Sequence, residues 1–201
     1  MFKKILILAS LLSVSLVSNA SIISAVDMDA IADGSHTHAN NPDIIATGYW
    51  GGEETRGIVE FDISGIASGA TATLNFDFLE YTGQLLYGQD VDYLGMFDIV
   101  AFDGDGVVTN SDFNPTGTVL GSFTVNGLNY GDTISVDISS VLGSISGDYI
   151  GFLFDPMSVN NGQGARMESV LGNLNITVVP EPASIALLGL GLLGLRARRT
   201  K

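Results

Sequence analysis

The segment Thr71–Tyr81, with the sequence TATLNFDFLEY, alternates apolar and polar side chains at the two-residue period of a β-strand. One face of this strand carries only apolar residues, namely Ala72, Leu74, Phe76 and Phe78. The segment Thr133–Ile138 repeats the pattern with Ile134, Val136 and Ile138. Alternation of this kind places one face against a core and the other in water, as in antiparallel sheets. The two segments therefore predict an antiparallel β-protein.

Short runs of β-branched and aromatic residues recur between clusters of Gly, Asn, Asp and Ser, which favour turns. No long segment shows the 3.6-residue period of a helix, and only a short helical turn is expected at Ser139–Leu142. This spacing predicts an all-β, antiparallel two-sheet sandwich of jelly-roll type over residues 21–179. The expected strands are Ile22–Asp27, Asp43–Thr47, Gly57–Asp62, Thr71–Tyr81, Gly95–Phe102, Thr118–Val125, Thr133–Ile138, Tyr149–Phe154 and Leu174–Val179, with loops at Gly34–Asn41 and Asn160–Gly164.

The predicted β-domain is strongly acidic. Residues 21–180 contain 21 Asp and Glu residues but only two basic residues, Arg56 and Arg166. A surface of this charge repels nucleic acid and anionic membranes and attracts cations. The 46% hydrophobic content favours a packed core over disorder. The chain has no cysteine, so the fold has no disulfide.

Residues 1–20 have the three parts of a secretory signal peptide. Lys3 and Lys4 form a positive start, Ile5–Val17 forms an apolar core, and Ser18–Asn19–Ala20 supplies the small residues that signal peptidase requires. The apolar core is too short to be a stable anchor. We therefore expect export and cleavage after Ala20.

The stretch AFDGDGVVTNSDF resembles a calcium-binding loop. With Gly106 at the sharp turn of a twelve-residue loop, ligand positions 3, 5 and 12 fall on Asp103, Asp105 and Asp112. The first ligand position is Ala101, which departs from the pattern, and no helices are expected on either side. A weak structural calcium site and an ordinary acidic β-turn both fit this stretch.

Two further segments suggest contacts with a ligand. Tyr49 and Trp50, between glycines, offer aromatic faces on which a sugar could stack, although a core role fits them too. His36 and His38 would point to one side of an extended segment, but two ligands without a third make a poor metal site. A solvated loop is the simpler interpretation of the two histidines.

No catalytic machinery stands out. The domain has no cysteine, no lysine and no G-x-S-x-G motif, so nucleophilic mechanisms lose most of their partners. Carboxylate pairs are abundant, which leaves a polysaccharide-cleaving hydrolase as the alternative. The acids are nevertheless spread over turns and polar strand faces, as solvated charges are. We therefore expect a protein without catalytic residues or a catalytic cofactor.

The end of the chain has three parts in order. Pro180, Glu181 and Pro182 end the last strand, residues 183–195 form an uncharged segment rich in Leu and Gly, and a basic cluster follows with Arg196, Arg198 and Arg199. Thirteen helical residues span about 20 Å, less than the ~30 Å hydrocarbon core of a bilayer. A marginal permanent anchor and a temporary one both fit this length.

These three parts closely resemble the PEP-CTERM sorting signal over residues 180–201. The resemblance implies that the short hydrophobic helix holds the exported chain transiently in the inner membrane of a Gram-negative bacterium. It also implies that exosortase, a membrane protease-transpeptidase, then reads Pro180-Glu181-Pro182 and processes the chain for the cell surface or the extracellular space. Such proteins commonly accompany exopolysaccharide production.

The order of motifs from Arg56 to Val179, including RGIVEFDISGIASGATATLNF and DYIGFLF, is similar to secreted jelly-roll domains of the carbohydrate-binding-module type. Because these motifs are strand and turn patterns, the similarity concerns the fold more than the function. We expect an exported, non-catalytic surface or matrix protein associated with exopolysaccharide or biofilm, which binds carbohydrate with support from calcium.

Overall fold

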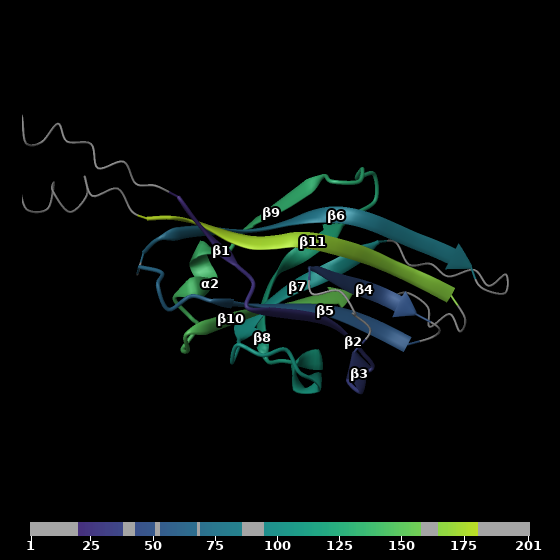
Figure 1. Cartoon of the computed structure of the whole chain (residues 1–201), viewed down its shortest axis with the longest axis horizontal. Coiled ribbons are helices and arrows are strands. Elements are labelled where there is room, and N and C mark those ends of the chain that lie inside the picture. The colour runs from purple at the N-terminus through teal and green to yellow at the C-terminus, as the bar shows by residue number, and fades with distance from the viewer. Residues whose placement is uncertain are drawn as a thin grey trace, which may run out of the picture.

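A computed structural model of the chain describes residues 20–37, 43–50, 53–67, 69–85, 95–157 and 165–180, apart from the side chains of residues 50, 80–85 and 165–168. These residues form an antiparallel β-structure with two short helical turns (Figure 1). The strands are β1 (Ser21–Ser24), β2 (Asp27–Ala32), β3 (His36–Thr37), β4 (Ile44–Trp50), β5 (Glu53–Asp62), β6 (Thr71–Leu85), β7 (Met96–Asp103), β8 (Gly117–Thr124), β9 (Thr133–Asp137), β10 (Tyr149–Pro156) and β11 (Ala165–Val179). The helical turns are η1 (Asn110–Phe113) and α2 (Ser139–Leu142).

The strands form one curled, hydrogen-bonded sheet. Its order is β8-β7-β10-β5-β4-β11-β6-β9, with β1 on β11, β2 on β5 and β3 on β2. Strands β4 and β5 pair only between Gly48–Trp50 and Glu53–Thr55, so the two halves of the sheet diverge from this hairpin and face each other (Figure 1). The prediction of an antiparallel all-β protein is confirmed. The finer prediction of two separate sheets in jelly-roll order stays a prediction.

The main core lies between the two halves of the sheet. Phe76 of β6 packs edge-on against Phe154 of β10, with ring centroids 5.2 Å apart, and Phe97 of β7 lies beside both rings. Such aromatic pairs add to the stability gained by burying apolar area. The apolar face predicted for Thr71–Tyr81 is confirmed, because Ala72, Leu74, Phe76 and Phe78 are all buried.

The single strand predicted at Ile22–Asp27 is wrong, because the chain forms two strands there. β1 pairs with β11 in one half of the sheet, and β2 pairs with β5 in the other half. The chain crosses between the halves at Ala25 and Val26, which a period-two pattern cannot reveal. The expected loop Gly34–Asn41 also contains the short strand β3, and residues 38–41 of that loop lie outside the described part.

The other predicted strands are found with shifted ends. β4, β5, β6 and β11 are longer than predicted because cross-strand pairing carries them through polar and glycine-containing segments. The helical turn predicted at Ser139–Leu142 is confirmed as α2. The loop predicted at Asn160–Gly164 lies outside the described residues.

Within the described ranges, no helix has both the length and the apolar character needed to cross a membrane. The apolar core predicted for the signal peptide, Ile5–Val17, and the predicted C-terminal helix at residues 183–195 both lie outside those ranges.

Candidate functional site

A loop over the outer face of the sheet forms the best-defined polar arrangement in the described structure. This covering loop, residues 104–116, joins β7 to β8 and includes η1. Beneath it lies a second, smaller core of four buried side chains, Ile31, Ile58, Phe102 and Leu153. Val108 and Phe113 of the loop pack against this core. The loop therefore shields apolar residues that the outer face of the sheet would otherwise expose.

Glu60 of β5 holds the first turn of the covering loop. Its side chain is fully buried, and its Oε2 accepts hydrogen bonds from the backbone N–H groups of Asp105 and Gly106, at 3.0 and 2.5 Å. Glu60 Oε1 is buried and has no hydrogen-bond partner. A Cβ on Gly104 would lie 2.6 Å from Oε2, so a larger residue there would displace the carboxyl group. Gly106 has a φ of +91°, which also favours glycine.

The electrostatic surroundings of Glu60 favour its protonated form. Burial raises the pKa of Glu60, and the nearby carboxylates of Asp112 and Asp105 raise it further. The N–H groups of Gly106 and Asp105 act in the opposite direction on this pKa, but they do not cancel the effect of burial. Glu60 is therefore a buried acid that keeps its proton to a higher pH than an exposed glutamate does.

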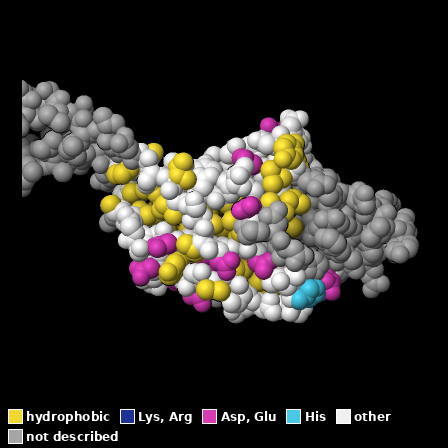
Figure 2. Space-filling view, in the orientation of Figure 1, with side chains coloured by type: hydrophobic (Ala, Val, Ile, Leu, Met, Phe, Trp, Pro, Cys, Tyr) yellow, Lys and Arg dark blue, Asp and Glu magenta, His cyan; other side chains and the backbone are white. Residues whose placement is uncertain are grey.

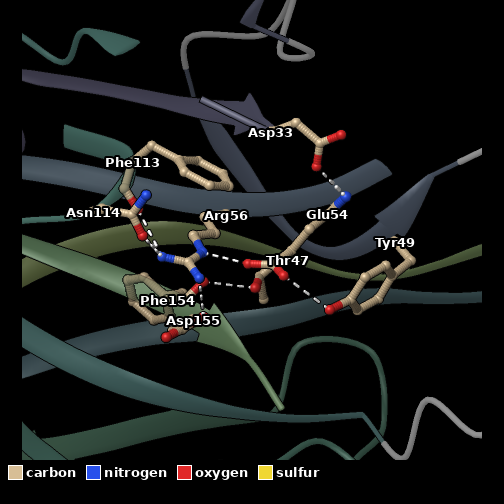
Figure 3. Close-up of polar contacts among 9 residues, drawn as sticks. All are labelled: Asp33, Thr47, Tyr49, Glu54, Arg56, Phe113, Asn114, Phe154 and Asp155. Atoms are coloured by element: carbon tan, nitrogen blue, oxygen red, sulfur yellow. Dashed lines mark hydrogen bonds and ion pairs between the residues drawn. The ribbon is translucent and has the colours of Figure 1, made fainter. Parts of the chain in front are cut away.

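Arg56, four residues before Glu60 on β5, holds the other end of the covering loop (Figure 3). Its Nη1 donates to the carbonyl oxygen of Phe113 and to Oδ1 of Asn114, both at 2.7 Å. The guanidinium carbon also lies 4.5 Å from the centre of the Phe113 ring, a cation–π contact. Arg56 is the only Lys or Arg whose side chain the structure describes.

Two carboxylates complete the surroundings of Arg56 (Figure 3). Arg56 Nε donates to Oε1 of Glu54, and Nη2 lies 3.2 Å from Oδ1 of Asp155. Burial raises the pKa of Asp155, and Arg56 offsets part of this effect. Tyr49 donates its hydroxyl to Oε2 of Glu54 at 3.1 Å. One guanidinium thus connects β5, β10 and the covering loop through directed hydrogen bonds.

The three predicted calcium ligands lie at the end of β7 (Asp103) and on the covering loop (Asp105 and Asp112), and each accepts a hydrogen bond from a backbone N–H group. Asp103 Oδ1 accepts from the N–H of Ser146, and Asp105 Oδ1 accepts from the N–H of Val107. Asp112 Oδ2 accepts from the N–H and hydroxyl of Thr109. Among the described residues, no three acidic or histidine side chains are grouped closely enough to hold a metal ion. Calcium binding by these three residues therefore stays a prediction.

The remaining predicted ligand contacts lie on other segments of the chain. Tyr49 is only 5% exposed, so its ring lies inside the protein, and the Trp50 side chain lies outside the described part. His36 is exposed, with Nε2 3.3 Å from Oε2 of Glu53, and His38 lies outside the described residues. Sugar contact at Tyr49 and Trp50 stays a prediction, and the interpretation of His36 as part of a solvated segment agrees with its exposure.

The sequence did not identify Glu60 or Arg56 as site residues, although it contains an indication for each of them. Glu60 lies within the apolar run GIVEF, where a charged residue requires a buried partner. Arg56 is one of only two basic residues in a domain with 21 acids, so it has an unusual number of possible ion-pair partners. These composition signals do not say which partners the fold selects.

The last strand ends in a recognised motif. Residues 178–199 match the PEP-CTERM protein-sorting motif. Val178 and Val179 are the last residues of β11, and Pro180 follows them, so the motif begins inside the folded sheet. The match supports export, processing by exosortase and sorting to the cell surface. A comparison with curated proteins finds no match. Glu181, Pro182 and the three arginines of the motif lie outside the described residues.

Proposed function

We propose that this protein is a non-catalytic component of the cell surface or extracellular matrix of a Gram-negative bacterium, associated with exopolysaccharide or biofilm. The observation that carries the proposal is the sorting motif at residues 178–199, which directly continues the last strand of an acidic β-domain. We further propose that the two facing halves of the sheet act as the layers of a jelly-roll sandwich.

The use of charged side chains supports a structural role. The two carboxyl groups with raised pKa values are the buried Glu60, which holds the start of the covering loop, and the partly exposed Asp155, which pairs with Arg56 at its other end. A hydrolase would instead need a raised-pKa acid that reaches its substrate. Acidic side chains are scattered over the face in Figure 2, and none of the described residues coloured there is basic. This pattern suits a soluble domain that repels its own copies and attracts cations.

Sorting is tested by replacing Pro180, Glu181 and Pro182 together with alanine. We expect this variant to remain in the membrane fraction with its C-terminal segment intact, because exosortase can no longer read the motif. The measurement is cell fractionation with mass determination of the chain, in a host that carries an exosortase. A Tyr130→Ala variant with an intact motif, at a side chain that is 79% exposed, serves as a control and should be sorted normally. Normal processing of the triple-alanine variant would contradict the sorting proposal.

The non-catalytic role is tested on exopolysaccharide from the producing organism. We expect the purified protein to co-sediment with the polymer and to release no sugar from it. A Trp50→Ala variant should co-sediment less if the aromatic pair contacts sugar, while an exposed-site control such as Tyr130→Ala should be unchanged. Release of sugar that disappears on Asp→Asn substitution would establish the hydrolase alternative instead.

The calcium proposal predicts that millimolar calcium raises the melting temperature above the value measured with chelator. The carboxylates of Asp103, Asp105 and Asp112 would have to leave their backbone partners to bind the ion, so we expect weak binding. The increase should disappear in the Asp112→Asn variant. An unchanged melting midpoint would remove all three residues from the set of candidate ligands.

A further inference from the structure

The strand that leads into the sorting motif is paired along both of its edges. On one edge, β6 pairs with β11 as far as Thr71 opposite Val179. On the other edge, β1 pairs with it from Ser24 opposite Asn175 to Ser21 opposite Val178. The motif match begins at Val178, so its first residue is held within the sheet on both sides.

The two covering strands differ in how firmly they are held. β6 contributes buried core residues such as Leu74 and Phe76. β1 has only four residues, none of them fully buried, and its Ile22 side chain is 72% exposed. Only Ile23 of this strand packs against the main core. β1 is therefore the edge that can separate from β11 at lower free-energy cost, because less apolar area is uncovered.

A hollow of about 500 Å³ lies beside β1 at the same end of the sheet. It is lined by Ser21–Ile23 of β1, by residues of the β5–β6 connection such as Ile66 and Ala67, and by Val178 and Pro180. Val179 is 42% exposed nearby. The start of the motif thus adjoins a surface with apolar side chains and space for a partner.

Enzymes that process peptides commonly hold their substrate as an extended strand, through main-chain hydrogen bonds that resemble strand addition to a sheet. We propose that β1 is a displaceable cover, and that the processing enzyme binds the β11 edge at residues 175–178 in its place. This inference rests on the proposed sorting by exosortase. It assigns the docking surface on the folded domain and makes release of β1 a step before processing.

The register of the sheet provides a matched pair of disulfides for the test. Thr177 lies opposite Ile22 on β1 and opposite Thr73 on β6. Cross-strand partners lie about 4.5–5.5 Å apart between Cα atoms, within the range that a disulfide spans. Ile22→Cys with Thr177→Cys locks β1 in place, whereas Thr73→Cys with Thr177→Cys locks β6. The chain has no native cysteine, so each variant forms one defined bond.

The measurement is the rate at which the full chain loses its C-terminal segment in cells that carry an exosortase, followed by mass spectrometry. We expect the β1-locked chain to be processed at least about tenfold more slowly than wild type, which corresponds to about 1.4 kcal/mol on the barrier. The β6-locked chain should stay within about twofold, a change of less than 1 kcal/mol. Chemical reduction should restore processing of the β1-locked chain.

Equal rates for the two locked chains, whether both fast or both slow, would overturn the inference. As a second variant, Ile23→Ala weakens the packing of β1 and should speed processing while the domain still melts cooperatively. Slower processing of this variant would mean that β1 is part of what the enzyme binds, which also overturns the inference. If wild type itself is not processed, the sorting proposal fails and this inference fails with it.

Discussion

Replacing Arg56 with alanine should lower the free energy of unfolding by about 2–3 kcal/mol. The change removes a guanidinium group whose side chain is only 16% exposed and which pairs with two carboxylates. Glu54 and Asp155 lose their cationic partner, and the carbonyl oxygen of Phe113 loses its donor. The ring of Phe113 also loses its cation–π contact. Urea denaturation at neutral pH measures the change. Hydrogen exchange in residues 104–116 should rise in parallel if Arg56 holds the covering loop.

The matched control for this prediction is Arg56→Lys. Lysine keeps the charge but has a single ammonium group, which cannot reach Glu54, Phe113 and Asp155 in three directions or stack flat on a ring. We expect it to recover about half of the stability lost in the alanine variant, or about 1 kcal/mol. Full recovery by lysine would show that charge alone is important. Unchanged stability of the alanine variant would contradict the role assigned to Arg56.

The sequence alone predicted the parts of the fold that depend on local periodicity. The alternation in Thr71–Tyr81 correctly identified the buried face of β6, and the runs between turn residues located most other strands, although with shifted ends. It did not predict the division of Ile22–Asp27 into β1 and β2, because each part follows a different distant partner, β11 or β5. Pairing between strands that are distant in the sequence leaves no local signal.

The candidate site shows the same limit. The stretch from Asp103 to Asp112 was recognised as unusual, and the positive φ of Gly106 agrees with a sharp turn there. The group at the centre of this turn is the carboxyl group of Glu60, which lies on β5, 45 residues before Asp105. The N–H groups of Asp105 and Gly106 point to a carboxylate oxygen, whereas a calcium ion would attract carbonyl and carboxylate oxygens. Residue spacing within the loop cannot distinguish a turn built around a carboxyl group from a turn built around a calcium ion.

Taken together, these contacts connect an acid and a base on one strand to the two ends of one loop. Glu60 accepts N–H groups at the start of the covering loop, and Arg56 donates to carbonyl groups at its end. The smaller core under the loop includes Ile58, which lies between Arg56 and Glu60 on β5. This core is shielded from water only while both ends of the covering loop are held. A domain without disulfides can in this way fix a long connection with side chains from a single central strand.

Glu60 should give the domain a measurable and unusual pH dependence. Because the pKa of Glu60 is raised above its ordinary value of 4.5, the folded protein binds its proton more tightly than the unfolded chain does. The stability that this group contributes is therefore fully present below about pH 4.5 and is lost as the pH rises through the raised pKa. Above this raised pKa the ionised carboxylate, with Oε1 unpaired, destabilises the folded state.

A Glu60→Gln variant should consequently be more stable than wild type at pH 7, by about 1 kcal/mol, and the difference should shrink toward pH 4. The amide oxygen can still accept hydrogen bonds from the N–H groups of Asp105 and Gly106. Glutamine is neutral at every pH in this range, so its burial does not require the binding of a proton. Urea denaturation of both proteins across this pH range isolates the contribution of Glu60 from that of the other acids.

Asp62, two residues along the same strand, provides a control of opposite sign. Hydrogen bonds from Ser64 lower the pKa of this exposed carboxyl group, so its contribution is present at neutral pH and is lost as the pH falls. Asp62→Asn should therefore be less stable than wild type at pH 7, with the difference shrinking in acid. If Glu60→Gln instead lost stability at pH 7, the ionised carboxylate, and not the protonated acid, would be the form that holds the covering loop.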